Sequence, residues 1–244
     1  MRTFVHFIPI ATTVIALAFC GALIRRYRWK GGAHLLWWAI GAATYAAGTA
    51  AEATVTLFGW SETVFRFWYI AGALLGGAPL AQGAVYLHVP RRIADRLSVA
   101  LVAAVAIAAI FVLVVPIRYE LVEPHRLTGR VMAWPWVRAF SPFINLYAFV
   151  FLVGGAVRSA LQFAGHRETR YRATANALIA VGALLPGIGG SFTRFGHTEV
   201  LYVTEFIGII LIYLGYRHAV RGAPASPVSA HEIRHQSAPV APAG

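Results

Sequence analysis

Seven apolar runs, each long enough to cross a lipid bilayer, constrain the fold of this chain more than any other feature. A membrane-spanning helix needs about 20 mostly apolar residues. Seven segments meet that requirement, at about residues 4–24, 34–58, 65–88, 97–117, 140–163, 172–194 and 199–219. In lipid, only helices and closed barrels satisfy all their backbone polar groups. We therefore predict an all-α fold, a polytopic membrane protein with a bundle of seven transmembrane helices.

The composition supports the same class of protein. Hydrophobic residues make up 59% of the 244 residues and charged residues only 12%, whereas a soluble domain carries about 25% charged residues. Because so little polar surface is available, we predict that residues 1–221 form one transmembrane domain. Residues 222–244 are rich in Ala, Pro and Ser. They cannot bury enough apolar surface to fold, so we predict a disordered cytoplasmic tail.

The 21 Lys and Arg residues are divided unequally between the two sides of the predicted bundle. Fourteen fall on the side of the C-terminus and seven on the side of the N-terminus. Cytoplasmic loops of membrane proteins carry the excess of Lys and Arg. We therefore expect the N-terminus outside and the C-terminus in the cytoplasm. Because the charges lie between apolar runs, we expect anionic headgroups of the lipid bilayer, and no nucleic acid, as their partners.

Two acidic residues, Glu52 and Glu205, lie inside predicted spans, where ionisable groups are costly and are therefore candidates for function. Glu52 precedes the outer end of the second span by six residues, and Glu205 follows the outer start of the seventh span by six residues. At about 1.5 Å per residue, both lie roughly 9 Å below the outer boundary. We therefore expect the two carboxyl groups to meet in one layer. If the protein is an enzyme, these two residues are its catalytic candidates.

Further polar side chains are expected in the same layer, so that a polar pocket forms in the outer leaflet. Its predicted ligand-binding residues are Glu52, Arg66, Tyr69, Asn145, Arg194 and Glu205. The long connection 117–139 is expected to lie over this layer as a lid. In this hypothesis Arg66 and Arg194 neutralise the two carboxylates. The alternative is that these residues only pair with one another to fix the helices, because polar groups in membrane bundles serve both purposes.

Several classes of membrane protein are excluded by missing residues. Lys30 is the only lysine and lies outside the predicted spans, so no retinal Schiff base can form. Cys20 is the only cysteine, and the two intramembrane carboxyl groups have no histidine beside them. We therefore expect no metal site and no cofactor. No H-E-x-x-H, Walker A or Rossmann glycine pattern occurs either.

Small residues and prolines mark the expected helix contacts. Gly72 and Gly76 form a GxxxG pattern, which lets helices approach closely in lipid. Pro79 and Pro186 are expected to kink the third and sixth helices. Three polar residues in the inner half are expected to form hydrogen bonds between helices, namely Gln82, Tyr86 and Asn176.

Three stretches resemble a family of uncharacterised bacterial seven-helix integral membrane proteins: HLLWWAIGAATYAAGTAAEA at 34–53, FRFWYIAGALLGGAPLAQGAVYL at 65–87 and LLPGIGGSFTRFG at 184–196. More remotely, the chain is similar to the seven-helix input regions of sensor histidine kinases. The resemblance implies a multi-pass protein of the bacterial cytoplasmic (inner) membrane. Known sensors of that kind continue into kinase domains, and the residues after 221 are too few for one. A separate cytoplasmic signalling partner is therefore expected.

The leading functional hypothesis is a stand-alone sensor or binding protein that takes a small or lipid-like ligand in the outer pocket. An alternative follows from a similarity to small seven-helix terpene cyclases, which use one acid in an early helix and one in the last. This similarity implies an intramembrane acid–base enzyme acting on an isoprenoid or lipid. A third possibility is a small transporter, which needs a polar path from the outer layer to the inner polar residues.

Overall fold

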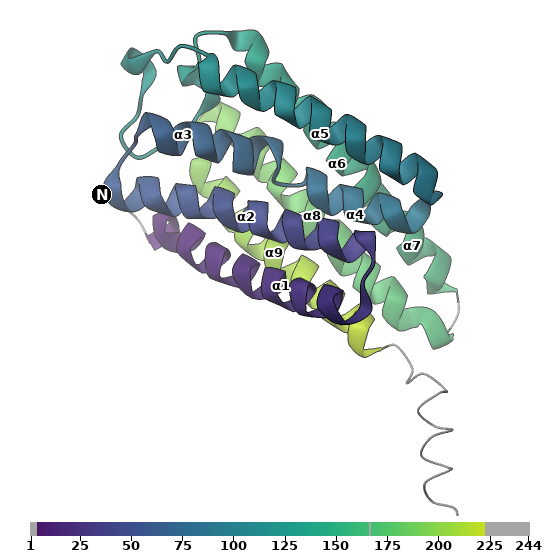
Figure 1. Ribbon diagram of the computed structural model, residues 1–244. Helices are drawn as coiled ribbons and strands as arrows, with labels where there is room; N and C mark the ends of the chain where they lie inside the picture. The colour runs from purple at the N-terminus through teal and green to yellow at the C-terminus, as the bar shows by residue number, and fades with distance from the viewer. Residues whose placement is uncertain (1–3, 166, 223–244) are drawn as a thin grey trace, which may run out of the picture.

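The computed structural model describes residues 4–165 and 167–222, and this part of the chain forms a bundle of helices (Figure 1). These residues contain no β-strand, although one isolated antiparallel bridge joins Ile117 to Met132. The predicted tail, residues 222–244, lies outside the described residues except for Gly222.

Seven helical passages run along the bundle. Four of them are single or nearly single helices: η1 (Phe4–Phe7) with α1 (Ile8–Lys30), α2 (Ala33–Phe58), α5 (Arg91–Val114) and α9 (Thr198–Arg221). The third passage consists of α3 (Glu62–Trp68), the π-helix η2 (Tyr69–Leu74) and α4 (Ala78–His88). The fifth passage consists of η5 (Pro135–Ala139), α6 (Phe140–Ala148), the π-helix η6 (Phe149–Gly154) and α7 (Gly155–Ala164). The sixth consists of η7 (Arg167–Thr169), α8 (Arg170–Phe192) and η8 (Thr193–Phe195).

These elements confirm the prediction of a bundle of apolar helices. Within the described ranges, six passages are long and apolar enough to cross a membrane. The remaining passage, α2, is about as long as the other six. It contains many Ala, Gly and Thr residues, and half of its residues are buried. A helix enclosed by its neighbours needs less apolar surface than one that faces lipid. Accordingly α5, whose apolar window is only 17% buried, has the highest mean hydropathy, 3.0.

Successive passages run in opposite directions, so the bundle has two ends. The N-terminal end, where the described chain begins, also holds connections 59–61, 115–134 and 193–197. The C-terminal end holds connections 31–32 and 89–90, residues 165 and 167–169, and the end of α9. The connection 115–134 contains two short 3-10 helices, η3 (Tyr119–Leu121) and η4 (Gly129–Val131).

The third passage is interrupted rather than kinked at proline. The helix stops after Leu74 and resumes at Ala78, so Pro79 lies in the first turn of α4. Proline fits that position because its missing N–H has no helical partner there. The expectation of a kink at Pro79 is therefore wrong. Pro186 does lie inside a helix, α8, as the sequence indicates.

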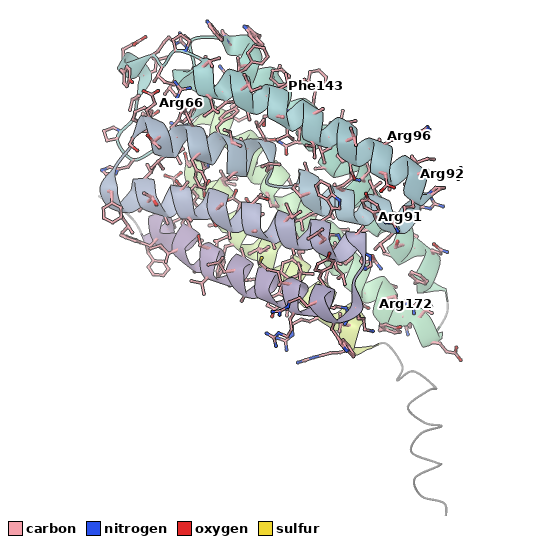
Figure 2. The ribbon with its side chains drawn as sticks, in the orientation of Figure 1. Arg66, Arg91, Arg92, Arg96, Phe143 and Arg172 are labelled. Carbon is pink, nitrogen blue, oxygen red and sulfur yellow. The ribbon has the colours of Figure 1, made fainter. Side chains whose placement is uncertain are left out.

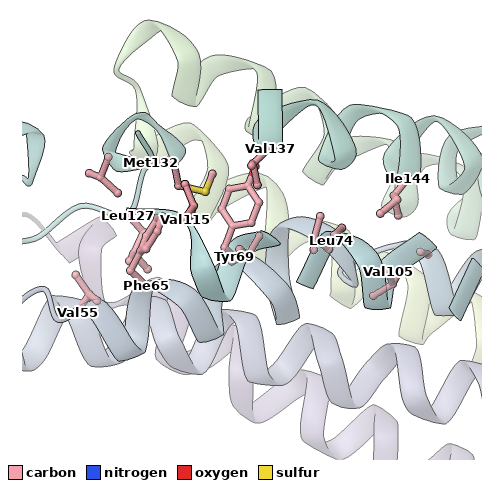
Figure 3. Close-up of a cluster of buried hydrophobic side chains, with 14 of the residues drawn as sticks. Val55, Phe65, Tyr69, Leu74, Val105, Val115, Leu127, Met132, Val137 and Ile144 are labelled. Carbon is pink, nitrogen blue, oxygen red and sulfur yellow. The ribbon is translucent and has the colours of Figure 1, made fainter. Parts of the chain in front are cut away.

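A cluster of buried apolar side chains fills the space between the third passage, α5 and the connection 115–134 (Figure 3). Phe65 and Leu74 of the third passage are fully buried there, as is Met132 of the connection. Tyr69 belongs to the same cluster and is only 5% exposed. The long connection is therefore packed onto the bundle by apolar contacts.

Glycines allow the closest helix contacts. A Cβ atom on Gly182 of α8 would lie 2.6 Å from the carbonyl oxygen of Gly208 in α9. A Cβ atom on Gly48 of α2 would lie 2.8 Å from the Cα atom of Gly72 in η2. Both distances are shorter than any real Cβ contact, so these backbones can pack this tightly only where no side chain is present.

We predict that Gly182→Ala destabilises the protein, because the new methyl group meets backbone that cannot move aside. Overpacking of this kind costs about 1–3 kcal/mol. Gly187→Ala, in the same helix, is the matched control, because nothing lies within 4 Å of its Cβ position. Thermal unfolding of the two purified variants in the same detergent checks the prediction, and equal midpoints would contradict it.

Candidate functional site

Glu52 and Glu205 form a carboxyl pair where α2 and α9 meet. The two carboxyl groups lie close enough to interact directly. Glu52 is only 3% exposed, and the Oε2 atom of each residue is buried. The expected meeting of two acids distant in the sequence therefore occurs. Two buried carboxyl groups this close, without a basic partner, cannot both be ionised at low cost, so we infer that the pair shares a proton.

Aromatic side chains from neighbouring helices surround this pair. The indole Nε1 of Trp68 donates to Glu52 Oε1 at 3.0 Å. The hydroxyl group of Tyr45 donates to the backbone carbonyl oxygen of Glu205 at 2.9 Å. Neither Oε2 atom has a hydrogen-bond partner among the residues that the structure describes. The pair thus keeps unused acceptor capacity in a buried place, where unsatisfied polar atoms are costly.

A cavity of about 350 Å³ opens at the N-terminal end of the bundle, on the side of the carboxyl pair. It is lined by residues of η1, the connection 115–134 and the start of α9: His6, Glu123, Pro124, His125, Arg126, Gly196, Thr198, Glu199 and Tyr202. Tyr202 is 3% exposed and lines the cavity. It lies one helical turn before Glu205 in α9, so the cavity and the carboxyl pair border neighbouring turns of this helix.

The cavity lining itself contains unsatisfied polar atoms. Thr198 is 9% exposed, and its Oγ1 atom is buried without a partner in the described part of the chain. The Nε atom of Arg126 is buried and unpartnered in the same sense, although its Nη1 atom lies 3.0 Å from Glu123 Oε1. His6 Nε2 lies 3.9 Å from Glu199 Oε1. The lining thus offers hydrogen-bond donors and acceptors together.

The long connection forms one wall of this cavity, as a lid over the layer would. The backbone N–H of Trp60 donates to the carbonyl oxygen of Pro124 at 2.8 Å. Arg126 Nη2 donates to the carbonyl oxygen of Thr193 at 3.1 Å. These bonds attach the connection to segments that follow α2 and α8. The hydroxyl group of Tyr119 also donates to the carboxylate of Glu62, and this hydrogen bond raises the pKa of Tyr119.

Arg66 does not neutralise either acid of the pair. Its Nη2 atom lies 2.7 Å from Glu62 Oε1, one turn earlier in the same helix. It also donates to the carbonyl oxygens of Val112 and Val115 at the end of α5. The nearby Glu62 captures this guanidinium group, so the expected pairing with Glu52 is wrong. The side chain of Arg194 lies outside what the structure describes.

Tyr69 and Asn145 do not line the cavity either. Tyr69 is packed in the apolar cluster of Figure 3, beside Phe65. Asn145 is an exposed residue of α6, and it donates to the carbonyl oxygen of Ala73 at 3.2 Å and to Ser141 Oγ at 3.1 Å. It thus bonds a carbonyl group near the interruption of the third passage. Both residues have structural contacts outside the cavity, and their expected role in ligand binding stays a prediction.

Helical spacing in the sequence places Thr49 and Tyr202 in the layer of the two acids, and it also points to Tyr45 and Thr198, which were missed. Tyr45, Thr49 and Glu52 lie four and seven positions apart in α2, on one face. The same spacing puts Thr198, Tyr202 and Glu205 on one face of α9. Thr49 contributes a hydrogen bond to Thr13 of α1 at 2.9 Å. His6 and Arg126 carried no such signal, because they come from segments whose position depends on the fold.

A second polar network joins helices in the half of the bundle that lies toward its C-terminal end. Gln82 donates to Ser98 Oγ at 2.8 Å and accepts from the hydroxyl group of Tyr147. Tyr86 donates to Asp95 Oδ1 at 2.7 Å. The expected interhelical bonds of Gln82 and Tyr86 are thus present, whereas Asn176 bonds a carbonyl oxygen of its own helix. Among the described residues, no group of three or more His, Cys, Asp or Glu side chains could hold a metal ion.

We predict that one carboxyl group of the pair is protonated in the folded protein. Its infrared carbonyl stretching band should shift in D₂O and disappear in the Glu52→Gln/Glu205→Gln double variant. Glu199→Gln is the matched control on the same helix, because Glu199 is exposed and lies 3.9 Å from His6. A band that persists in the double variant, or that Glu199→Gln removes, would rule out the shared proton.

We also predict that the hydrogen bond from Tyr119 of the long connection to Glu62 weakens at high pH. Because the pKa of Tyr119 is raised in the fold, its stabilising effect is complete below the ordinary tyrosine value of about 10. The effect is lost as pH rises through the raised value. A tyrosinate absorbance titration, taken as the difference between wild type and Tyr119→Phe, should show this late titration. Glu62→Gln should return it toward the ordinary value.

Comparisons of the chain with protein-family models, with curated proteins and with solved structures give no match. Family membership therefore contributes nothing to the assignment of a site. What the site can do follows from its own geometry: a buried carboxyl pair, and beside it a cavity with charged side chains of both signs whose Tyr202 lies one helical turn from Glu205.

Proposed function

We propose that this protein is a multi-pass membrane protein that binds a small polar ligand in the cavity at the N-terminal end, and that it acts as a stand-alone sensor or binding protein. One observation carries the proposal. Thr198 Oγ1 and Arg126 Nε, which belong to residues that line the cavity, are buried without a partner in the described part of the chain, and the carboxyl pair lies one helical turn beyond Tyr202. Buried polar atoms normally have partners, so a site with several unpartnered ones is suited to a ligand that supplies them.

The size and lining of the cavity favour a small polar ligand over a lipid tail. Its volume of about 350 Å³ is near the lower limit of small-molecule sites. The lining includes His6, Glu123, His125, Arg126 and Glu199. An acyl or isoprenoid chain would make no hydrogen bonds with these groups. A ligand with both hydrogen-bond donors and acceptors matches them, because Thr198 Oγ1 can give or accept a bond and Arg126 Nε can donate one.

The distribution of charge supports an outward-facing cavity. The C-terminal end carries most of the Arg residues, including Arg91, Arg92, Arg96 and Arg172, whereas Arg66 lies toward the other end (Figure 2). The excess of positive charge belongs to the cytoplasmic side. In this orientation the cavity faces away from the cytoplasm. The ligand would then come from outside the cell or from the outer leaflet.

Signal transfer through α9 fits the same arrangement. Thr198 and Tyr202 of α9 line the cavity, and the helix continues unbroken to Arg221 at the other end. Its contact with α8 includes Pro186, whose Cδ atom is 3.1 Å from the Cβ position of Gly208. A ligand that moves the start of α9 would therefore move its basic cytoplasmic end, where a separate signalling partner would detect the change.

A second candidate function, an intramembrane acid–base enzyme, is favoured by the pair itself. Two carboxyl groups that share a proton provide one acid and one base in the same site. An isoprenoid or lipid substrate would need an apolar channel to reach them, and the cavity is instead bordered by charged side chains of both signs. For this reason ligand binding is the first proposal. Lipid extracts of cells carrying wild type or Glu52→Gln/Glu205→Gln would differ in one product if the enzyme hypothesis holds.

Native mass spectrometry of the purified full chain tests the binding proposal. Wild type should carry a small adduct that Thr198→Trp removes, because the indole group would fill the cavity. Thr174→Trp is the matched control. Thr174 is an exposed threonine near the start of α8, at the end of the bundle opposite to the cavity. Adducts common to all three proteins are lipid or detergent. If Thr198→Trp loses no adduct that Thr174→Trp keeps, the proposal is wrong.

A further inference from the structure

A second cavity, of about 580 Å³, lies at the opposite end of the bundle between α1 and α9. It is lined by Ala22, Arg25, Arg26, Trp29, Tyr213, Tyr216 and Arg217. Arg25 and Arg26 lie in the last two turns of α1, and Arg217 lies in the last two turns of α9. Three guanidinium groups and three aromatic rings thus border one space. This cavity is separate from the carboxyl pair and does not depend on the function proposed for that pair.

The positive charge in this cavity has no counterpart in the described part of the chain. No acidic residue lines the cavity, and none of the three arginines forms an ion pair among the described residues. Arg217 lies over the ring of Tyr213, with its guanidinium carbon 5.8 Å from the ring centre. Like charges brought together in this way repel each other, so the arrangement favours an anion between them.

Guanidinium groups and aromatic rings together fit a phosphate ester at a membrane surface. Arginine presents a planar fork of N–H donors that binds phosphate oxygens in pairs. Trp29 is 79% exposed at the end of α1. Exposed tryptophan and tyrosine rings are typical of the level of lipid headgroups. The cavity therefore lies where a phospholipid head would be found.

The face of α1 that borders the cavity continues as an apolar surface along the helix. Val14, which is 61% exposed, and the exposed Ala18 lie on the same face as Ala22 and Arg25, because these residues are spaced four, four and three positions apart. In a bilayer these side chains would face acyl chains. A free phosphate ion would use the arginines but not this surface, whereas a phospholipid would use both.

We propose that the cavity between the C-terminal parts of α1 and α9 binds the headgroup of an anionic phospholipid. Arg25, Arg26 and Arg217 hold the phosphate group, and the aromatic rings border the headgroup. The acyl chains lie along the exposed apolar residues of α1. Basic pockets between helices on the cytoplasmic side of a membrane are suited to such headgroups, and the C-terminal end carries the excess of positive charge.

The purified full chain in detergent, titrated with phosphatidylglycerol or phosphatidylcholine and followed by native mass spectrometry, tests this proposal. Wild type should bind one phosphatidylglycerol more tightly than the others and more tightly than phosphatidylcholine. The triple variant Arg25→Gln/Arg26→Gln/Arg217→Gln should weaken that binding about tenfold or more, because charge-assisted hydrogen bonds are lost. If wild type binds the two lipids equally, the site does not exist.

The matched control is Arg91→Gln/Arg92→Gln/Arg96→Gln, which removes the same charge from the same end of the bundle (Figure 2). It should keep the tight site. If both triple variants lose binding equally, the attraction is only general charge. Inorganic phosphate forms a separate arm: if it competes as well as phosphatidylglycerol at equal concentration, the site takes free phosphate and the phospholipid proposal fails.

A milder variant distinguishes loss of lipid binding from loss of folding. Arg217→Lys keeps the charge but removes the planar fork, so binding of phosphatidylglycerol should fall while the unfolding temperature in phosphatidylcholine stays that of wild type. Unchanged binding in Arg217→Lys, together with an unchanged unfolding temperature, would show that Arg217 does not hold the phosphate group.

Discussion

Burial of two carboxyl groups without a basic partner is the constraint around which this bundle is arranged. A lone carboxylate in an apolar interior is very costly, so it must be paired or protonated. Arg66 is held by Glu62 and by carbonyl groups of α5, and it therefore cannot serve Glu52. The remaining solution is a shared proton between Glu52 and Glu205, with Trp68 donating one further bond. α2 and α9 must meet closely for this pair to form.

Close packing of small residues makes that meeting possible. Gly48 of α2 lies against Gly72 of η2, and Gly182 of α8 lies against Gly208 of α9. Burial of apolar surface contributes little free energy to helix association in lipid. Tight backbone contacts and hydrogen bonds between helices must therefore stabilise the bundle. The two mechanisms act together here, because the same helices that pack through glycine also carry the polar pairs.

The first passage (η1 with α1) and α9 take part in both cavities, which differ in chemistry. At the N-terminal end, η1 and α9 contribute His6, Glu199 and Tyr202 to a cavity with charges of both signs. At the C-terminal end, the same two passages contribute only arginines and aromatic rings beside Ala22. This contrast matches the asymmetry of a membrane, with an aqueous ligand proposed on one side and an anionic lipid surface on the other.

The sequence by itself determined the helical class, the positions of the seven passages and the common depth of Glu52 and Glu205, because hydropathy and residue spacing are local properties along a helix. It could not determine which neighbour each polar side chain would meet. Arg66 was closer to Glu62 than to Glu52, Tyr69 turned toward an apolar cluster, and Pro79 opened a new helix after an interruption. His6, Arg126 and Tyr202 come together from three separate segments. Only tertiary packing decides such contacts, because helix rotation and the course of a long connection depend on every surface they touch.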